Sequence, residues 1–533
     1  MTSDPDDSPR GDAFAPGDAD SAITSEAGPG ARQESLAVEL RALVVVAAPV
    51  ALVQLGAKLL GLVDTAVVGR LGQSALAGVG LADGVYFLTM LFGLGVMLGL
   101  DPLMAQAIGA DRPRDARRWF RQGVWIALLL GPLLIGLAAL IGANLELFGV
   151  EPGVCGEARR YLHARMFAII PTLLFAGARS ALLARSRTRP MVLAVIFANV
   201  LNVPASVGLT FGDRALVELG LPAIGFAGLG VVGAGLASVI AELVQWLCLL
   251  FALGRLNRED GPELADDLTW TPRPTQLLKA ARVGMPQAFA MICEVGAFVT
   301  TAFLMARISE LAMASHQVAI QLASTTFMIP VGISQACAMR VGHAIGRGDA
   351  RGTRRAGQAA LLAGLAFMSA SSLLFLTIPE PLARILTDEG EIVRATLPLL
   401  FVAALFQLSD GAQIIATGLL RGAGDTRWPF LANLGGHYLI GLPIGALLTF
   451  RLGYGPVGLW WGLSLGLTIA ALTLALRFLI LSLRPIARLD PDGDEREVGQ
   501  SDVGSAAAKT PTRDRPAPAR ENQIKPAPAQ HPG

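Results

Sequence analysis

Long runs of apolar residues, separated by short polar stretches, fill the chain between about residues 36 and 485. A membrane-spanning helix needs about 20 consecutive, mostly apolar residues, whereas a strand of a membrane barrel needs only about ten. The apolar segments lie near residues 41–69, 76–103, 120–146, 163–184, 191–211, 228–254, 281–306, 312–342, 356–378, 395–420, 428–450 and 457–483. The pattern therefore predicts an all-α polytopic membrane protein with twelve transmembrane helices.

The composition supports this prediction. Of the 533 residues, 53% are hydrophobic and only 16% are charged, and the mean hydropathy is +0.53. Soluble domains carry roughly 25% charged residues, because a surface in water needs charge. The formal net charge of +1 provides no overall field that would attract nucleic acid, so no nucleic-acid partner is predicted.

The two ends of the chain differ from the middle. Residues 1–35 and 486–533 are polar and rich in Pro, Gly and Ala. Such segments cannot bury enough apolar area to offset the entropy lost on ordering, so we predict two disordered tails. The first tail has no basic segment followed by an apolar one, so it is not a secretory signal.

Arginines in the predicted loops indicate the orientation. The loops after spans 2, 4, 6, 8 and 10 are rich in arginine, whereas the alternate loops carry one or two basic residues each. The positive-inside rule places the arginine-rich loops in the cytoplasm. Both tails are then expected to be cytoplasmic.

The two halves of the chain resemble each other. AQAIGADRPRDARR, around residue 108, matches GHAIGRGDARGTRR, around residue 345, and GRLGQSALAG matches ARISELAMAS at the same offset of 237 residues. A constant offset across separated stretches indicates an internal repeat. Each repeat has six spans, so we expect two six-helix lobes related by a pseudo-two-fold axis along the membrane normal. The predicted lobes are residues 36–254 (N-lobe) and 280–485 (C-lobe), joined by a cytoplasmic linker at 255–279.

Few motifs indicate enzyme chemistry or ATP use. The chain has no GxxxxGK[ST], no HExxH and no His/Cys cluster with metal-ligand spacing. Its GxSxG motif at 462–466 lies inside the last apolar span, where it indicates helix packing. Of the four cysteines, Cys155 is expected in an outer loop and the others in spans, where they pack. We therefore expect no cofactor and no enzymatic activity.

Ionisable residues inside the predicted spans are the main functional candidates, because each costs about 3 kcal/mol in lipid by insertion scales. A buried carboxylate that faces a cavity can exchange a proton, Na⁺ or a cationic substrate, as an antiporter requires. We expect this role first for Glu294 and Asp410, and next for Asp64. The full set is Lys58, Asp64, Asp101, Glu242, Glu294, His316, Asp410 and His437.

Each candidate also has a purely structural interpretation. A carboxylate can pair with a basic side chain, as Glu242 could with Arg179, and Asp101 precedes a proline near a helix end. A single histidine in a span is often only hydrogen-bonded. Asn199 and Asn202 could coordinate an ion or bridge helices. Arginines nearer the span ends are expected to extend toward the membrane surface: Arg165, Arg179 and Arg340.

At these residues the sequence resembles the multidrug and toxic compound extrusion (MATE) family, especially its bacterial NorM-type branch. The resemblance covers residues 36–485 and implies two six-helix lobes in the bacterial inner membrane, with drug export driven by Na⁺ or H⁺. It also implies that Glu294 and Asp410 form a cation site and that Asp64 is the aspartate of the VDT motif. The segments that carry it are LVDTAVVGRLG (62–72), RVGMPQAFAMICEVGAF (282–298), ASHQVAIQLAS (314–324), MRVGHAIGRGD (339–349) and QLSDGAQIIATGLLRGAGDTR (407–427).

Lys58 departs from the pattern, because an uncharged residue is expected at its position. It precedes Asp64 by six residues, about 240° around a helix, so the two are poor partners. We expect Lys58 to reach an acidic group elsewhere or to extend toward the membrane surface. A fixed positive charge in the cavity would discourage cationic drugs.

These observations predict a monomeric, secondary active multidrug efflux transporter that exports drugs and organic cations in exchange for Na⁺ or H⁺ by alternating access. A lipid-linked saccharide flippase of related architecture is an alternative that would need several basic residues in the cavity, and a membrane-embedded enzyme is another. If the coupling ion is Na⁺, Glu294 and Asp410 are its predicted ligands. The predicted site residues are Glu294, Asp410, Asp64, His316, Asn202, Asn199 and Lys58.

Overall fold

The computed structural model describes residues 36–148, 151–218, 222–223, 225–259 and 270–489. The predicted tail 1–35, residues 490–533 of the other tail, and residues 260–269 of the predicted linker lie outside the described residues. Within the described part of the chain, twelve helical segments are long and apolar enough to cross a membrane. The predicted all-helical class and the twelve spans are therefore confirmed.

The N-lobe helices belong to the first six spans. The second span is divided into two helices, α2 and α3, and the fourth into α5 and α6, which join through a 3₁₀ turn at Met166–Ala168. The helices are α1 (Leu36–Val68), α2 (Gln73–Met97), α3 (Leu100–Gly109), α4 (Pro113–Ala143), α5 (Pro152–Arg165), α6 (Ile169–Ala184), α7 (Arg189–Phe211), α8 (Asp213–Glu218) and α9 (Val231–Glu259).

The C-lobe helices belong to the last six spans. The eleventh span contains two π-helical segments, Leu434–Gly441 and Leu447–Arg451. The helices are α10 (Pro274–Ala306), α11 (Glu310–Gly346), α12 (Ala350–Thr377), α13 (Pro379–Arg384), α14 (Gly390–Gly422), α15 (Arg427–Asn433), α16 (Leu442–Ala446) and α17 (Pro456–Leu481).

The fourth span starts earlier than the sequence predicted. It begins at Pro152, in the first turn of α5, instead of near residue 163. Cys155, Ala158 and Tyr161 are buried at spacings of three residues, which is the pattern of a helix with one packed face. The prediction of an outer loop for Cys155 is therefore wrong, because polar residues on the other face of α5 concealed the helix.

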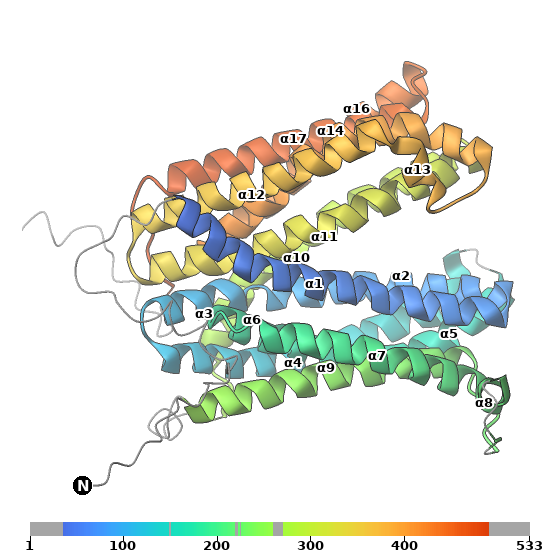
Figure 1. Ribbon diagram of the computed structural model, residues 1–533, viewed down its shortest axis with the longest axis horizontal. Helices are drawn as coiled ribbons and strands as arrows, with labels where there is room; N and C mark the ends of the chain where they lie inside the picture. Colours follow the sequence, from blue (N-terminus) through green and yellow to red (C-terminus); the bar gives the residue numbers. More distant parts are fainter. Residues whose placement is uncertain (1–35, 149–150, 219–221, 224, 260–269, 490–533) are drawn as a thin grey trace, which may run out of the picture. The chain divides into compact units, whose positions relative to one another are not determined.

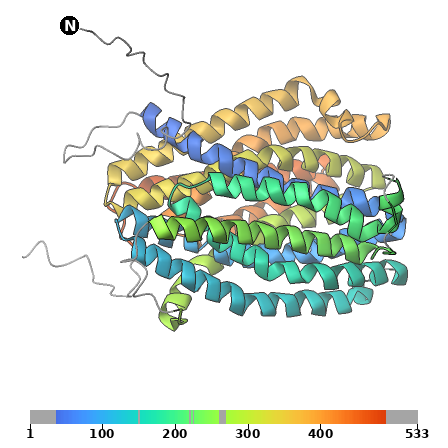
Figure 2. The ribbon, with the colours of Figure 1, turned by 60° about the horizontal axis from the view of Figure 1, so that its bottom comes forward.

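The lobes meet along α1, α2 and α3 of the N-lobe and α10 and α11 of the C-lobe. In Figure 1 the blue α1 lies between the other N-lobe helices and the yellow α11. Figure 2 shows that the long helices of both lobes run in roughly the same direction. We refer to the end of the lobes that carries the loops after α3, α6, α11 and α14 as the arginine-rich end.

Glycines allow the backbones of the two lobes to approach closely toward the arginine-rich end. A methyl group on Gly95 would lie 2.3 Å from Cα of Ala288, and one on Gly99 would lie 2.6 Å from the backbone nitrogen of Gly284. Small residues permit such close packing between membrane helices. The described glycines that pack against the other lobe are Gly95, Gly99, Gly109, Gly284, Gly332, Gly342 and Gly346.

Gly284→Leu is expected to destabilise the protein, because a methyl group on Gly284 would lie 2.2 Å from the carbonyl oxygen of Val96. Overpacking costs about 1–3 kcal/mol, and the obstructing atom here is backbone. Gly80→Leu in α2 is the matched control, since nothing lies within 4 Å of a methyl group at that position. Thermal unfolding in detergent measures the difference. Equal melting temperatures for the two variants would contradict the prediction.

Candidate functional site

Two acidic side chains lie together in the C-lobe. Glu294 is on α10 and the buried Asp410 is on α14, close enough for their charges to interact. Neither carboxylate has an ion pair with a lysine or arginine of the described chain. The alternative interpretation, in which each simply pairs with a basic side chain, therefore has no support among the described residues.

Two amide side chains hold Glu294 in place. Gln413 Nε2 and Asn433 Nδ2 each donate a hydrogen bond to Glu294 Oε2 at 3.1 Å, and Gln413 Nε2 also donates to Asn433 Oδ1 at 3.0 Å. The buried Gln413 Oε1 has no hydrogen-bond partner among the described residues. A half-turn of this amide would direct its oxygen toward Glu294, where oxygen atoms could coordinate Na⁺.

Sequence analysis missed both amides. Neutral Gln and Asn side chains carry no charge that would mark them within an apolar span. One signal was available, because Gln413 follows Asp410 by three residues and thus lies near it on the same side of α14.

A π-helical segment follows Asn433. π-Helical turns are rare and are frequent at functional sites. Gly436, in the segment Leu434–Gly441, packs so closely against α17 that a methyl group there would lie 2.5 Å from the carbonyl oxygen of Gly466. The same segment carries His437, which is fully buried and whose ring nitrogens have no hydrogen-bond partner in the described structure.

The predicted site residue His316 lies in an aromatic cluster. Its ring centroid is 5.7 Å from that of Trp460, which is 5.8 Å from that of Phe406. His316 is buried, and its Nδ1 has no hydrogen-bond partner among the described residues. No described contact joins it to Glu294 or Asp410, so its role in transport stays a prediction.

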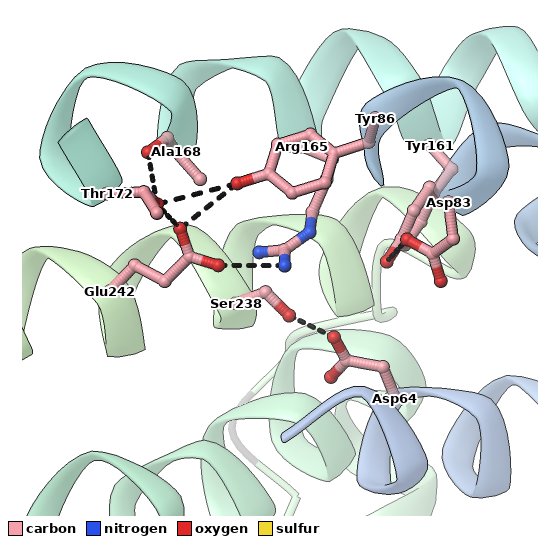
Figure 3. Close-up of polar contacts among 9 residues, drawn as sticks. All are labelled: Asp64, Asp83, Tyr86, Tyr161, Arg165, Ala168, Thr172, Ser238 and Glu242. Carbon is pink, nitrogen blue, oxygen red and sulfur yellow. Dashed lines mark hydrogen bonds and ion pairs between the residues drawn. The ribbon is translucent and has the colours of Figure 1, made fainter. Parts of the chain in front are cut away.

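A second polar cluster lies inside the N-lobe (Figure 3). Arg165 Nη2 pairs with Glu242 Oε1 at 2.8 Å, and the Arg165 guanidinium carbon lies 4.5 Å from the centroid of the Tyr86 ring. Tyr86 Oη donates to Glu242 Oε2 at 3.1 Å, and Thr172 Oγ1 donates to the same oxygen. Arg165, and not Arg179, is thus the partner of Glu242.

Arg165 is only 8% exposed, so the expectation that it extends toward the membrane surface is wrong. The reason is the length of the fourth span, since Arg165 ends α5 in the middle of a segment that runs from Pro152 to Ala184. A span beginning near residue 163 would have placed Arg165 at its end.

Two further carboxylates lie beside Arg165 (Figure 3). Ser238 Oγ donates to Asp64 Oδ2, while Asp64 Oδ1 is buried and has no described hydrogen-bond partner. Tyr161 Oη donates to Asp83 Oδ1 at 3.0 Å. The cluster thus contains three carboxylates and one guanidinium. Sequence analysis did not identify Asp83 as part of it.

The two asparagines of α7 differ in their surroundings. Asn199 Nδ2 donates to the carbonyl oxygen of Gly56 at 3.1 Å, so it bridges α7 and α1. Asn202 lies beside Asp64 and is fully buried, and its amide atoms have no hydrogen-bond partner in the described structure. Of the pair, Asn202 is therefore the better candidate for an ion ligand.

Lys58 extends from α1 to the C-lobe. Its Nζ donates to Ser324 Oγ at 2.7 Å and to Thr325 Oγ1 at 3.1 Å, both on α11. It forms no ion pair with a carboxylate of the described chain. The expectation of an acidic partner is thus wrong, because the neighbouring surface of α11 presents hydroxyl groups.

Two ion pairs join the lobes at the arginine-rich end. Arg340 Nε and Nη2 donate to the two carboxylate oxygens of Glu39 at 2.5 and 2.6 Å. Arg421 Nε lies 3.7 Å from Asp101 Oδ2, and both side chains are buried. Asp101 is also in the first turn of α3, so it combines the helix-terminus position that the sequence indicated with a contact to the C-lobe.

Arg179 also joins the lobes. Its Nη1 donates to Gln335 Oε1 at 3.0 Å, and the side chain is 9% exposed. The expectation that it extends toward the membrane surface is wrong, because α6 packs against α11 at this point. Arg340, the third arginine of that prediction, is held instead by Glu39.

The MatE family model matches residues 49–207 and 286–447. The matched segments start 237 residues apart, at residues 49 and 286, which is the offset of the repeated motifs. One match falls in each lobe, which supports the predicted internal repeat.

The chain is also similar to named proteins over most of its length. It is 36% identical over 463 residues to the probable multidrug resistance protein NorM of Bradyrhizobium diazoefficiens, covering 85% of this chain and 96% of that protein. It is 34% identical over 425 residues to the protein of the same name from Brucella suis, covering 78% and 87%. These similarities confirm the resemblance that the motifs indicated.

Solved structures share the fold. The eukaryotic MATE transporter AtDTX14 matches with a TM-score of 0.72 and 20% identity, covering 84% of this chain and 96% of that chain. A structure described as the outward-facing conformation of a multidrug resistance MATE family transporter of the MOP superfamily matches with a TM-score of 0.72 and 18% identity, with the same coverage.

Proposed function

Because the chain belongs to the MatE family of multidrug efflux transporters, we propose that it is a secondary antiporter of the bacterial inner membrane that exports drugs and organic cations in exchange for Na⁺ or H⁺. Twelve apolar helices make it a multi-pass membrane protein. One observation carries the proposal: Glu294 and Asp410 lie together inside the spans without a basic partner among the described residues.

These carboxylates provide the physical basis of exchange. An ionised carboxylate away from water is costly unless a positive charge neutralises it. A proton, Na⁺ and the cationic group of a drug can each do so, and they compete for the same charge. Gln413 and Asn433 keep Glu294 in position for this competition. Binding of the ion therefore favours release of the drug.

The N-lobe cluster contributes a second place for a coupling ion. Arg165 balances one of its three carboxylates, which leaves negative charge for a proton or Na⁺ to neutralise. Asp64 is the carboxylate best placed to bind it, since Asp64 Oδ1 and the neighbouring Asn202 amide are buried and have no described hydrogen-bond partners.

The contacts between the lobes indicate the conformational change. With the arginine-rich loops in the cytoplasm, the Glu39–Arg340 and Asp101–Arg421 ion pairs close the cytoplasmic side. Both tails are then cytoplasmic, and these contacts must separate when substrate enters from inside. Ion binding shifts this equilibrium only if the ion has different affinities for the two conformations.

Gradient-driven dye transport tests the proposed function. We expect the purified protein in liposomes to accumulate the cationic dye rhodamine 123 when either a Na⁺ or a pH gradient is imposed, because the ion and the dye compete for the carboxylates. Imposing the two gradients separately identifies the coupling ion. Liposomes without protein are the control, and dye movement equal to theirs under both gradients would contradict the proposal.

A further inference from the structure

Lys58 has an unusual position for a basic residue inside a membrane span. Its ammonium group contacts two neutral hydroxyls, those of Ser324 and Thr325, at 2.7 and 3.1 Å. Other basic residues within the lobes have carboxylate partners, as Arg165 has Glu242. Lys58 has no such partner in the described chain, and its side chain is only partly buried. Since an ammonium has three N–H donors, one remains for a ligand.

The part of α11 that Lys58 contacts is polar. Gln317, Gln321 and Thr325 follow one another at intervals of four residues, so they share one side of the helix, and all three are exposed. Thr325 accepts the hydrogen bond from Lys58 of the N-lobe. This side of α11 therefore faces the N-lobe. Amide groups would be unfavourable against lipid, but they suit a water-filled space between the lobes.

We propose that Lys58 recognises an anionic group of the substrate, and that the preferred substrates are amphipathic zwitterions that carry a carboxylate as well as a cationic amine. The proposal rests on the efflux function proposed above. The carboxylate accepts a charge-assisted hydrogen bond from Lys58 Nζ, with the Gln317 and Gln321 amides as further donors. The amine is attracted to Glu294 and Asp410 in the C-lobe.

The charge of Lys58 distinguishes this role from simple fastening of the lobes. Two hydroxyl acceptors need only a neutral donor, and they do not offset the cost of placing a positive charge within a span. An anionic ligand does offset that cost. A fixed positive charge also repels a purely cationic drug, so the same residue favours zwitterions over monocations.

Binding of two matched dyes tests the proposal. Rhodamine 123 is the methyl ester of rhodamine 110, so at neutral pH the pair differs by one carboxylate. Fluorescence polarisation on the purified full chain in detergent, with no ion gradient, measures both Kd values. We expect Lys58→Met to weaken rhodamine 110 binding about tenfold, as for loss of one charge-assisted hydrogen bond, and to leave rhodamine 123 binding unchanged or tighter. Lys58→Arg is expected to keep the wild-type preference.

A second variant separates recognition from fastening. Ser324→Ala/Thr325→Val removes both hydroxyls that Lys58 contacts and leaves the charge in place, so we expect it to retain the preference for rhodamine 110. The proposal is overturned if Lys58→Met changes the two Kd values by the same factor, or if the hydroxyl variant reproduces its effect. A wild-type protein that binds neither dye also overturns it. Since no gradient is involved, failure of the efflux proposal is detected separately, as absence of dye transport in liposomes.

Discussion

Asp410→Asn and Glu294→Gln are each expected to abolish ion-driven export while the protein still folds and inserts. Each change keeps the size of the side chain and removes the charge for which the ion and the drug compete. Loss of a charged contact is worth a few kcal/mol in such a site, so the gradient-driven flux should fall by at least about tenfold. Flux in liposomes, normalised to the amount of incorporated protein, measures the effect.

An exposed acidic residue provides the matched control for these variants. Asp388 lies between α13 and α14 and is exposed to solvent, so Asp388→Asn makes the same chemical change outside the site and should transport normally. Gln413→Ala is expected to have an intermediate effect, because it removes a hydrogen bond to Glu294 and leaves the carboxylate. Wild-type flux in Asp410→Asn or Glu294→Gln would rule out the C-lobe pair as the coupling site.

Arg165→Met is expected to produce the largest loss of stability. Arg165 and Glu242 pair at 2.8 Å with side-chain exposures of only 9% and 11%. Removing one partner of a buried ion pair leaves an uncompensated charge and costs about 3–5 kcal/mol. The loss is expected at the high end here, because Asp64 and Asp83 also face the guanidinium. Thermal unfolding in detergent checks this prediction.

Two comparisons isolate the ion pair. Arg160→Met removes a surface arginine from the same helix, where it pairs with Glu157 at 2.6 Å with 64% of its side chain exposed. Such pairs contribute about 0–1 kcal/mol, so this variant should be nearly as stable as wild type. Arg165→Met/Glu242→Gln should recover part of the stability by removing one of the unbalanced charges. Equal melting temperatures for Arg165→Met and Arg160→Met would contradict a stabilising role for Arg165.

The sequence by itself determined the features that depend on local composition. Twelve apolar segments, the repeat offset of 237 residues, and the few ionisable residues inside spans, with Glu294 and Asp410 foremost, all follow from the order of the residues. The physical reason is that lipid requires a continuous apolar length and makes each charge conspicuous. Neither requirement depends on which helices become neighbours.

Only the tertiary structure decided the partners of these groups. Glu294 is held by Gln413 and Asn433, which are 119 and 139 residues away, and Lys58 contacts Ser324, 266 residues away. Neutral amides and hydroxyls leave no mark on the hydropathy pattern, and their importance arises when helix packing places them against a charge. For the same reason Arg165, which a local reading placed at a span end, became part of a buried cluster once α5 had extended its span. Charge marks a candidate along the chain, and helix packing determines what neutralises it.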